Sequence, residues 1–158
     1  MRILVSACLL GINCKYNGGN NKNENVLNLI EKYILIPVCP EQLGGLSTPR
    51  EPAEIVGGNG SDVLSREAKV VTNSGKDITQ MFVKGAEETL KIAKMFKAKI
   101  AILKDGSPSC GVKHIYDGTF THRIKSGSGV TASILKKSGM IVISEVEIDK
   151  IKAFTKMD

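Results

Sequence analysis

Four short, almost uninterrupted apolar runs constrain the fold more than any other feature of this sequence. Each is five residues long and rich in Val, Ile and Leu, and they span residues 2–6, 34–38, 99–103 and 140–144. A strand is hydrophobic along its whole length, rather than at alternate positions, when helices cover both faces of its sheet. The runs therefore predict the strands of a mainly parallel sheet.

Segments with helical periodicity separate these runs, at residues 25–33, 78–96 and 128–137. Strands that alternate with helices predict an α/β fold, here a single Rossmann-like three-layer sandwich. Residues 54–77 break the alternation. There, Val63-Leu64 and Ala68–Val71 are separated by polar turns, and we expect them to form a small β excursion.

A length of 158 residues suits one domain, and no linker or repeat divides the chain. We expect residues 1–145 to form the α/β domain. The tail, residues 146–158, contains Ile148, Ile151 and Phe154 at helical spacing. It is expected to form a short helix packed on the body of the domain.

Composition narrows the possible partners. The chain contains no apolar run long enough for a transmembrane helix, and its first residues form a strand pattern rather than a signal peptide. We therefore expect a cytoplasmic protein without a membrane partner. The net charge of +6 comes with only 4% aromatic residues and no dense basic stripe, so no stable nucleic-acid partner is expected. In a reducing compartment, the four cysteines favour metal binding, catalysis or burial over disulfides.

Three of these cysteines follow three of the predicted strands. Cys8 comes two residues after the first strand, Cys39 directly after the second, and Cys110 in a loop after the third. The carboxyl ends of parallel strands lie along one edge of a sheet, where ligands bind. The sequence therefore predicts that these three thiols converge. Cys14 lies in a nearby loop and is either a fourth ligand or a bystander.

The spacing of the cysteines leaves three kinds of site open. Zinc takes four ligands, which the three cysteines and His114 could supply. A 4Fe–4S cluster held by three cysteines would keep one iron open as a Lewis acid. Alternatively, one cysteine could attack a substrate and another resolve the intermediate.

Several motifs resemble the TudS-type thiouracil desulfidases, a family formerly classed as a domain of unknown function. The resemblance spans about residues 2–144 and rests on eight matching segments. These are Ser6–Gly11, Cys14–Gly19, Val38–Glu41, Leu43–Leu46, Thr48–Arg50, Ala53–Gly57, Ser107–Gly111 and Ile115–Phe120. It implies a 4Fe–4S cluster bound by Cys8, Cys39 and Cys110, with one iron free. Cys14 is not part of the ligand set that the resemblance implies.

The resemblance implies a non-redox desulfidase that converts thiouracil or a thiouridine monophosphate into the uracil compound and sulfide. Glu41, two residues after Cys39, is the predicted acid or base, and Ser107 and Ser109 are predicted to assist by hydrogen bonding.

Two further positions are predicted to contact the substrate. Arg50 could pair with a phosphate, and Ser128 and Gly129 open a helix whose amide groups could do the same. The alternative function is a non-enzymatic iron–sulfur or zinc module that binds a nucleotide or RNA. A module of that kind is expected to have a dense stripe of basic residues with interleaved aromatic residues, and this sequence has no such stripe.

Overall fold

Four parallel strands form the central sheet of the structure, a computed structural model that describes residues 1–155. Their order across the sheet is β2-β1-β5-β8, and their bounds are Arg2–Ser6 (β1), Ile34–Val38 (β2), Ile100–Leu103 (β5) and Ile141–Ser144 (β8). All three pairings are parallel. The predicted sheet is confirmed, with each strand beginning at most one residue from its predicted start.

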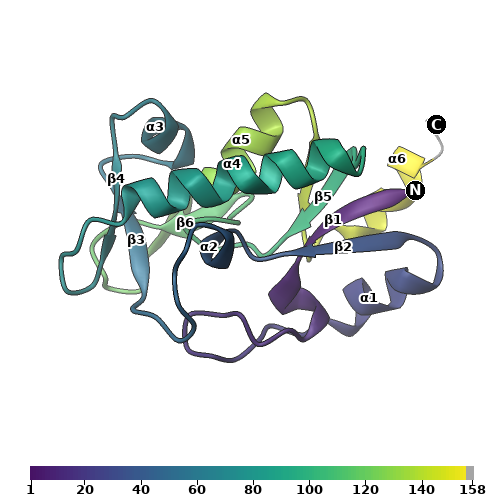
Figure 1. The fold of residues 1–158 in the computed structure, drawn as a ribbon, viewed down its shortest axis with the longest axis horizontal. Coiled ribbons are helices and arrows are strands. Elements are labelled where there is room, and N and C mark those ends of the chain that lie inside the picture. Colours follow the sequence, from purple (N-terminus) through teal and green to yellow (C-terminus); the bar gives the residue numbers. More distant parts are fainter. Residues whose placement is uncertain (156–158) are drawn as a thin grey trace.

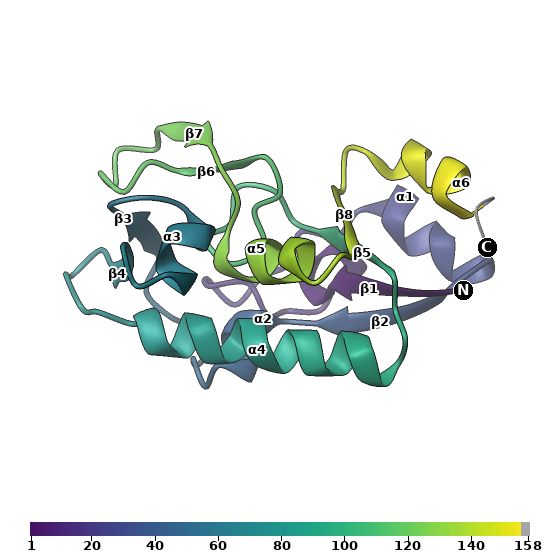
Figure 2. The same cartoon turned by 90° about the horizontal axis from the view of Figure 1, so that it is seen from above.

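Helices cover both faces of this sheet (Figure 2). One face carries α4 (Thr79–Met95) and α5 (Val130–Lys137), and the other carries α1 (Glu24–Leu27), the 3-10 turn η2 (Asn28–Glu31) and α6 (Ile151–Phe154). Side chains of β1 alternate between these layers. Leu4 packs with α4 and α5, whereas Ile3 and Val5 pack with α1 and α6. The three-layer α/β architecture predicted from the sequence is therefore confirmed.

A smaller lobe lies beyond the carboxyl ends of the parallel strands (Figure 1). It contains two antiparallel pairs and one short helix, with the bounds Ala53–Val56 (β3), Gly60–Leu64 (α3), Lys69–Thr72 (β4), His114–Tyr116 (β6) and Ile124–Ser126 (β7). A separate apolar cluster around Ile55, Phe82 and Ile115 joins this lobe to α4. The lobe thus forms a wall at the edge of the sheet where the cysteines were predicted to meet.

The β excursion is present, but its composition differs from the prediction. Val63 and Leu64 belong to α3 rather than to a strand, and the partner of β4 is β3. The reason is local, because Asn59 and Asp62 form a reciprocal capping box that starts a helix just before Val63.

Three short elements complete the described fold, namely η1 (Ala7–Leu10), α2 (Pro40–Leu43) and η3 (Ile148–Lys150). In the tail, Ile151 of α6 is 1% exposed and packs on the face of the sheet that α1 also covers. The last residues of the predicted tail, 156–158, lie outside the described residues. Within residues 1–155, no helix combines the length and hydrophobicity needed to cross a membrane.

Candidate functional site

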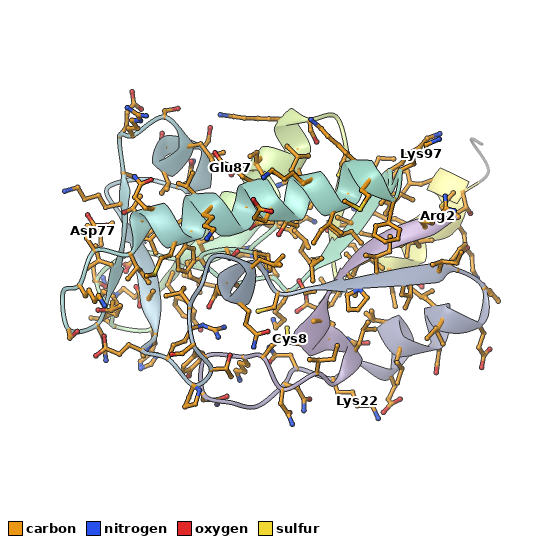
Figure 3. The ribbon with its side chains drawn as sticks, in the orientation of Figure 1. Arg2, Cys8, Lys22, Asp77, Glu87 and Lys97 are labelled. Atoms are coloured by element: carbon orange, nitrogen blue, oxygen red, sulfur yellow. The ribbon has the colours of Figure 1, made fainter. Side chains whose placement is uncertain are left out.

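Cys8, Cys39 and Cys110 lie at the carboxyl edge of the central sheet. Cys8 belongs to η1 directly after β1, Cys39 is the N-cap of α2 directly after β2, and Cys110 lies in the loop after β5. All three line one cavity of about 490 Å³. Figure 3 shows Cys8 at the opposite end of β1 from Arg2. The structure thus brings the three thiols together as the strand topology predicted, and their role as ligands stays a proposal.

Cys14 lines the same cavity and is 2% exposed. The Cys39 thiol donates to the backbone oxygen of Cys14 over 3.7 Å, and all four cysteines are free thiols. Cys14 is therefore in contact with one of the proposed ligands rather than distant from the site.

Charge interactions link the thiols to one another. Burial raises the pKa of Cys8 and of Cys110, and charge on the neighbouring cysteines raises it further. Cys39 behaves differently, because interaction with the Cys14 side chain, helped by the backbone N–H of Gln42, favours its ionised form and lowers its pKa to about 6. Several thiolates around one cavity repel each other, so a cationic group between them would stabilise the ionised set.

Local hydrogen bonds shape the loop that carries Cys110. Ser107 Oγ accepts the N–H groups of Ser109 and Cys110, both at 3.1 Å, and the Gly111 N–H donates to the Ser107 oxygen. Ser107 lines the cavity, and these bonds leave its hydroxyl hydrogen available to a substrate. Ser109 is not among the residues that line the cavity. It is 1% exposed, and its hydroxyl is hydrogen-bonded to Thr131 at 2.9 Å.

The first turn of α5 binds this loop instead of the cavity. The Gly129 N–H donates to the Gly111 oxygen at 2.8 Å, and the Val130 N–H donates to the Pro108 oxygen at 2.9 Å. Neither Ser128 nor Gly129 lines the cavity. Ser128 and Gly129 therefore lie outside the group of predicted site residues that line the cavity, and the Gly129 N–H already binds a backbone carbonyl.

Glu41 and Arg50 form a largely buried ion pair in the cavity wall. Arg50 Nε lies 2.6 Å from Glu41 Oε2, and the two side chains are 8% (Arg50) and 16% (Glu41) exposed. The guanidinium also donates to the Ser47 oxygen, to Thr48 Oγ1 and to the Cys14 oxygen, at 3.2, 2.9 and 2.8 Å. Arg50 was predicted to bind substrate. In the structure, its guanidinium holds Glu41 and the backbone at Cys14 in place.

Sequence reasoning missed several aromatic and basic side chains of the cavity wall, which are Lys15, Tyr16, Lys104, Tyr116, Phe120 and His122. Phe120 and His122 have φ angles of 56° and 61°, in the left-handed region that non-glycine residues seldom occupy. Glu54 fixes this turn by accepting the N–H groups of Gly118 at 3.0 Å and Phe120 at 3.2 Å. The turn-forming residues at 117–119 predict a loop. Nothing in the local sequence indicates that this loop forms part of the cavity wall.

Asp105 anchors both ends of the Cys110 loop. Its Oδ1 accepts the N–H groups of Val112, Lys113 and His114 at 2.9, 3.0 and 3.0 Å, and its Oδ2 lies 2.9 Å from His114 Nδ1. Burial raises the pKa of Asp105, but these hydrogen bonds outweigh it and hold the pKa well below its usual range. His114 is therefore engaged by Asp105 and does not line the cavity.

Replacing Asp105 with alanine should destabilise the protein by about 2–4 kcal/mol at pH 7, because charge-assisted hydrogen bonds are lost and N–H groups are left unpaired. A carboxylate with a depressed pKa stabilises the fold above its unfolded pKa of about 3.9, and the contribution is lost as pH falls below that value. The difference between wild type and Asp105→Ala should therefore shrink between pH 7 and pH 3. Urea unfolding followed by circular dichroism at both pH values measures it, and an unchanged difference would contradict the assignment.

The arrangement of the thiols fits a polynuclear group. Cys8, Cys39 and Cys110 line one cavity, each from a different part of the fold. A 4Fe–4S cluster takes one thiolate on each bound iron, so three thiols distributed in this way suit it.

The chain is similar to members of one family along nearly its whole length. The model of a family described as 2-thiouracil desulfurase matches residues 3–147. YbbK, an uncharacterized protein of Bacillus subtilis (strain 168), is 52% identical over 149 residues, which cover 94% of this chain and 99% of YbbK. The solved structure of TudS, a 4Fe–4S-dependent thiouracil desulfidase, matches with a TM-score of 0.85 and 35% identity over 99% of each chain.

Proposed function

Because the chain belongs to the 2-thiouracil desulfurase family, we propose that it removes sulfur from a thiouracil-type base, either free or as a nucleoside monophosphate. Water supplies the oxygen that replaces sulfur on the ring carbon, and the sulfur leaves with two protons as hydrogen sulfide. The reaction exchanges no net electrons. The observation that carries this proposal is the convergence of Cys8, Cys39 and Cys110 in one cavity with Glu41 and Ser107.

Cys8, Cys39 and Cys110 would hold a 4Fe–4S cluster as thiolates. When bound, the cluster supplies an iron without a protein ligand, a Lewis acid suited to the soft sulfur of a thiocarbonyl group. The lowered pKa of Cys39 prepares one thiolate for binding. Two of the three thiols are only partly buried, so iron can reach them from the cavity.

Glu41 is the residue best placed to move a proton. It lines the cavity two residues after Cys39, and one carboxylate oxygen is held by Arg50. The other oxygen can accept a proton from the water that attacks the ring carbon. Ser107 can donate its hydroxyl hydrogen to the base or to the same water, which would orient the attack.

The remaining wall suits a flat base with an anionic substituent. Tyr16, Tyr116 and Phe120 line the cavity. Aromatic side chains stack on the flat face of any nucleobase, whichever base it is. Lys15 and His122 lie on the same wall and can bind a phosphate group. These side chains therefore support both a thiobase and its nucleoside monophosphate as substrates.

The test is sulfide release by the anaerobically reconstituted protein. We expect about four irons per chain, and sulfide from thiouracil or thiouridine monophosphate only when the cluster is present. Iron and acid-labile sulfide are assayed on the same sample, and the oxo product is identified by chromatography. The control is the same protein stripped of iron by a chelator.

Two outcomes would count against the proposal. Equal sulfide release by the loaded and stripped protein would remove the cluster from the reaction. A loaded protein that binds thionucleotides without releasing sulfide would favour the alternative, a binding module rather than an enzyme.

A further inference from the structure

Glu54 is a buried carboxylate in the wall of the cavity, and the proposed reaction does not use it. It belongs to β3, lines the cavity and is 8% exposed. Its partners among the described residues are two backbone N–H groups, that of Gly118 at 3.0 Å and that of Phe120 at 3.2 Å. Burying a charge costs free energy unless the charge is fully paired, so the presence of a carboxylate here needs a reason.

The two hydrogen bonds of Glu54 involve only one of its oxygens. Both N–H groups donate to Oε1. Within residues 1–155, no fully buried side-chain oxygen lacks a hydrogen-bond partner. Oε2, which accepts no hydrogen bond there, is therefore still accessible. Because Glu54 as a whole is buried and lines the cavity, this accessible oxygen faces the cavity, where it can accept a hydrogen bond from a bound molecule.

Holding the neighbouring turn does not require a carboxylate. The turn packs directly on β3, since a Cβ atom on Gly118 would lie 2.6 Å from the backbone oxygen of Ile55. One acceptor oxygen is enough to bind the N–H groups of Gly118 and Phe120. A glutamine would supply that oxygen without burying a charge. The fold therefore accounts for Oε1 of Glu54, whereas Oε2 and the negative charge point to a ligand that donates hydrogen bonds.

Glu54 and the cysteines belong to different walls of the cavity. Cys8 and Cys39 directly follow strands of the central sheet, whereas β3 is part of the smaller lobe beyond the ends of those strands (Figure 1). In the proposed reaction the substrate sulfur lies at the cysteines, so Glu54 meets the part of the substrate that points away from the sulfur. An ionised phosphate has no hydrogen to donate and is repelled by a carboxylate. The hydroxyl groups of a ribose are hydrogen-bond donors.

We propose that Glu54 Oε2 accepts hydrogen bonds from the ribose hydroxyl groups of a thiouridine-type substrate, which makes Glu54 a specificity-determining residue. The inference rests on the proposed function, because that function places the sulfur end of the substrate at the cysteines. Hydrogen bonds to a charged acceptor are the stronger kind, and a site built to bind a hydroxyl group discriminates against the analogue that lacks it. The protein should therefore prefer ribonucleosides to the same nucleosides without these hydroxyl groups.

Nucleoside affinity tests this assignment separately from the chemistry. Uridine and dideoxyuridine, which lacks both vicinal ribose hydroxyl groups, contain no sulfur and are not consumed. Anaerobic isothermal titration calorimetry of the reconstituted protein therefore gives the Kd of each. The wild type should bind uridine about 10- to 100-fold more tightly, as expected for hydrogen bonds to a charged group. In Glu54→Gln this ratio should fall about tenfold, because the charge is lost while the amide oxygen still holds the turn.

Kinetics and a matched variant separate ribose binding from a change in charge or fold. Glu54→Gln should lose about tenfold in kcat/KM with thiouridine, mainly through KM, and keep the wild-type value with free thiouracil, which has no ribose. Glu51→Gln is the control, because it removes another carboxylate from the same cavity. Glu51 is exposed, and its Oε2 accepts a hydrogen bond from Ser74 Oγ at 2.8 Å. This variant should keep the wild-type ratio of the two nucleoside affinities.

The outcomes distinguish this inference from the proposed function. Equal binding of uridine and dideoxyuridine by the wild type would overturn the role of Glu54 without the need for any variant. A Glu54→Gln protein that keeps the full ratio would overturn it too, as would one that loses thiouracil turnover to the same extent as thiouridine turnover. A loaded protein that releases sulfide from neither substrate would overturn the proposed function, and the ratio of nucleoside affinities would still decide the role of Glu54.

Discussion

Replacing Cys110 with serine is expected to abolish both iron binding and sulfide release. A serine hydroxyl ionises far less readily than a thiol, and burial at this 6% exposed position would keep it neutral. Iron also prefers thiolate to a neutral oxygen ligand. With two thiolates left, iron should fall from about four per chain to below about one. Sulfide release should fall by at least about a hundredfold, since changes to outer partners alone cost about 10- to 100-fold.

Cys14→Ser is the matched control, because it makes the same atom exchange in the same cavity. It should keep its iron, since Cys14 is not one of the three proposed ligands. The hydrogen bonds that Ser107 makes to the Cys110 loop involve backbone N–H groups rather than the sulfur, so Cys110→Ser should keep its fold and its circular dichroism spectrum. A Cys110→Ser protein with its full complement of iron would show that Cys110 is not a ligand.

The parallel sheet could be predicted because its signal is local. The runs 2–6 and 34–38 form β1 and β2 with the bounds expected from their continuous hydrophobicity. The smaller lobe could not be predicted to the same extent. Ile55 faces Val70 across an antiparallel pair, which depends on contacts between distant segments, while the capping box at Asn59 directs Val63 into a helix.

The candidate site, too, could be predicted only in part. The convergence of Cys8, Cys39 and Cys110 follows from the rule that parallel strands end at one edge, so the sequence predicted it. Side-chain partners do not follow from that rule. Ser6 and Lys104 are 98 residues apart in the chain yet share a hydrogen bond, and no periodicity signals such a contact.

Arg50 and the first turn of α5 illustrate the same limit. Residue type correctly indicated groups that can bind an anion, but in the folded chain those groups bind Glu41 and the carbonyl oxygens of loop 108–111. A hydrogen-bond donor that the sequence suggests for a ligand can thus already be bound to another part of the protein. Sequence patterns predict which chemistry is available, whereas tertiary contacts decide which ligand receives it.

Glu41→Gln is expected to lower kcat by about a hundredfold or more while leaving iron content unchanged, the usual effect of removing a general acid or base. Glutamine has nearly the same shape, and its amide oxygen can still accept the Arg50 Nε hydrogen bond that Glu41 now accepts at 2.6 Å. The amide cannot take a proton from the attacking water. Steady-state sulfide release, measured with iron content on the same sample, gives kcat per loaded site.

The ion pair between Glu41 and Arg50 offers a second explanation for a lower kcat in Glu41→Gln, and a double variant tests it. Arg50 is 8% exposed, so the loss of the Glu41 charge leaves a largely buried guanidinium without its counterion, and that alone could distort the cavity. If the stranded charge were the cause, Glu41→Gln combined with Arg50→Gln would recover activity. If Glu41 moves the proton, the double variant stays as slow as Glu41→Gln. Arg50→Gln alone, which keeps the carboxylate but loosens it, should then lose less kcat than Glu41→Gln, because a poorly held base still accepts protons.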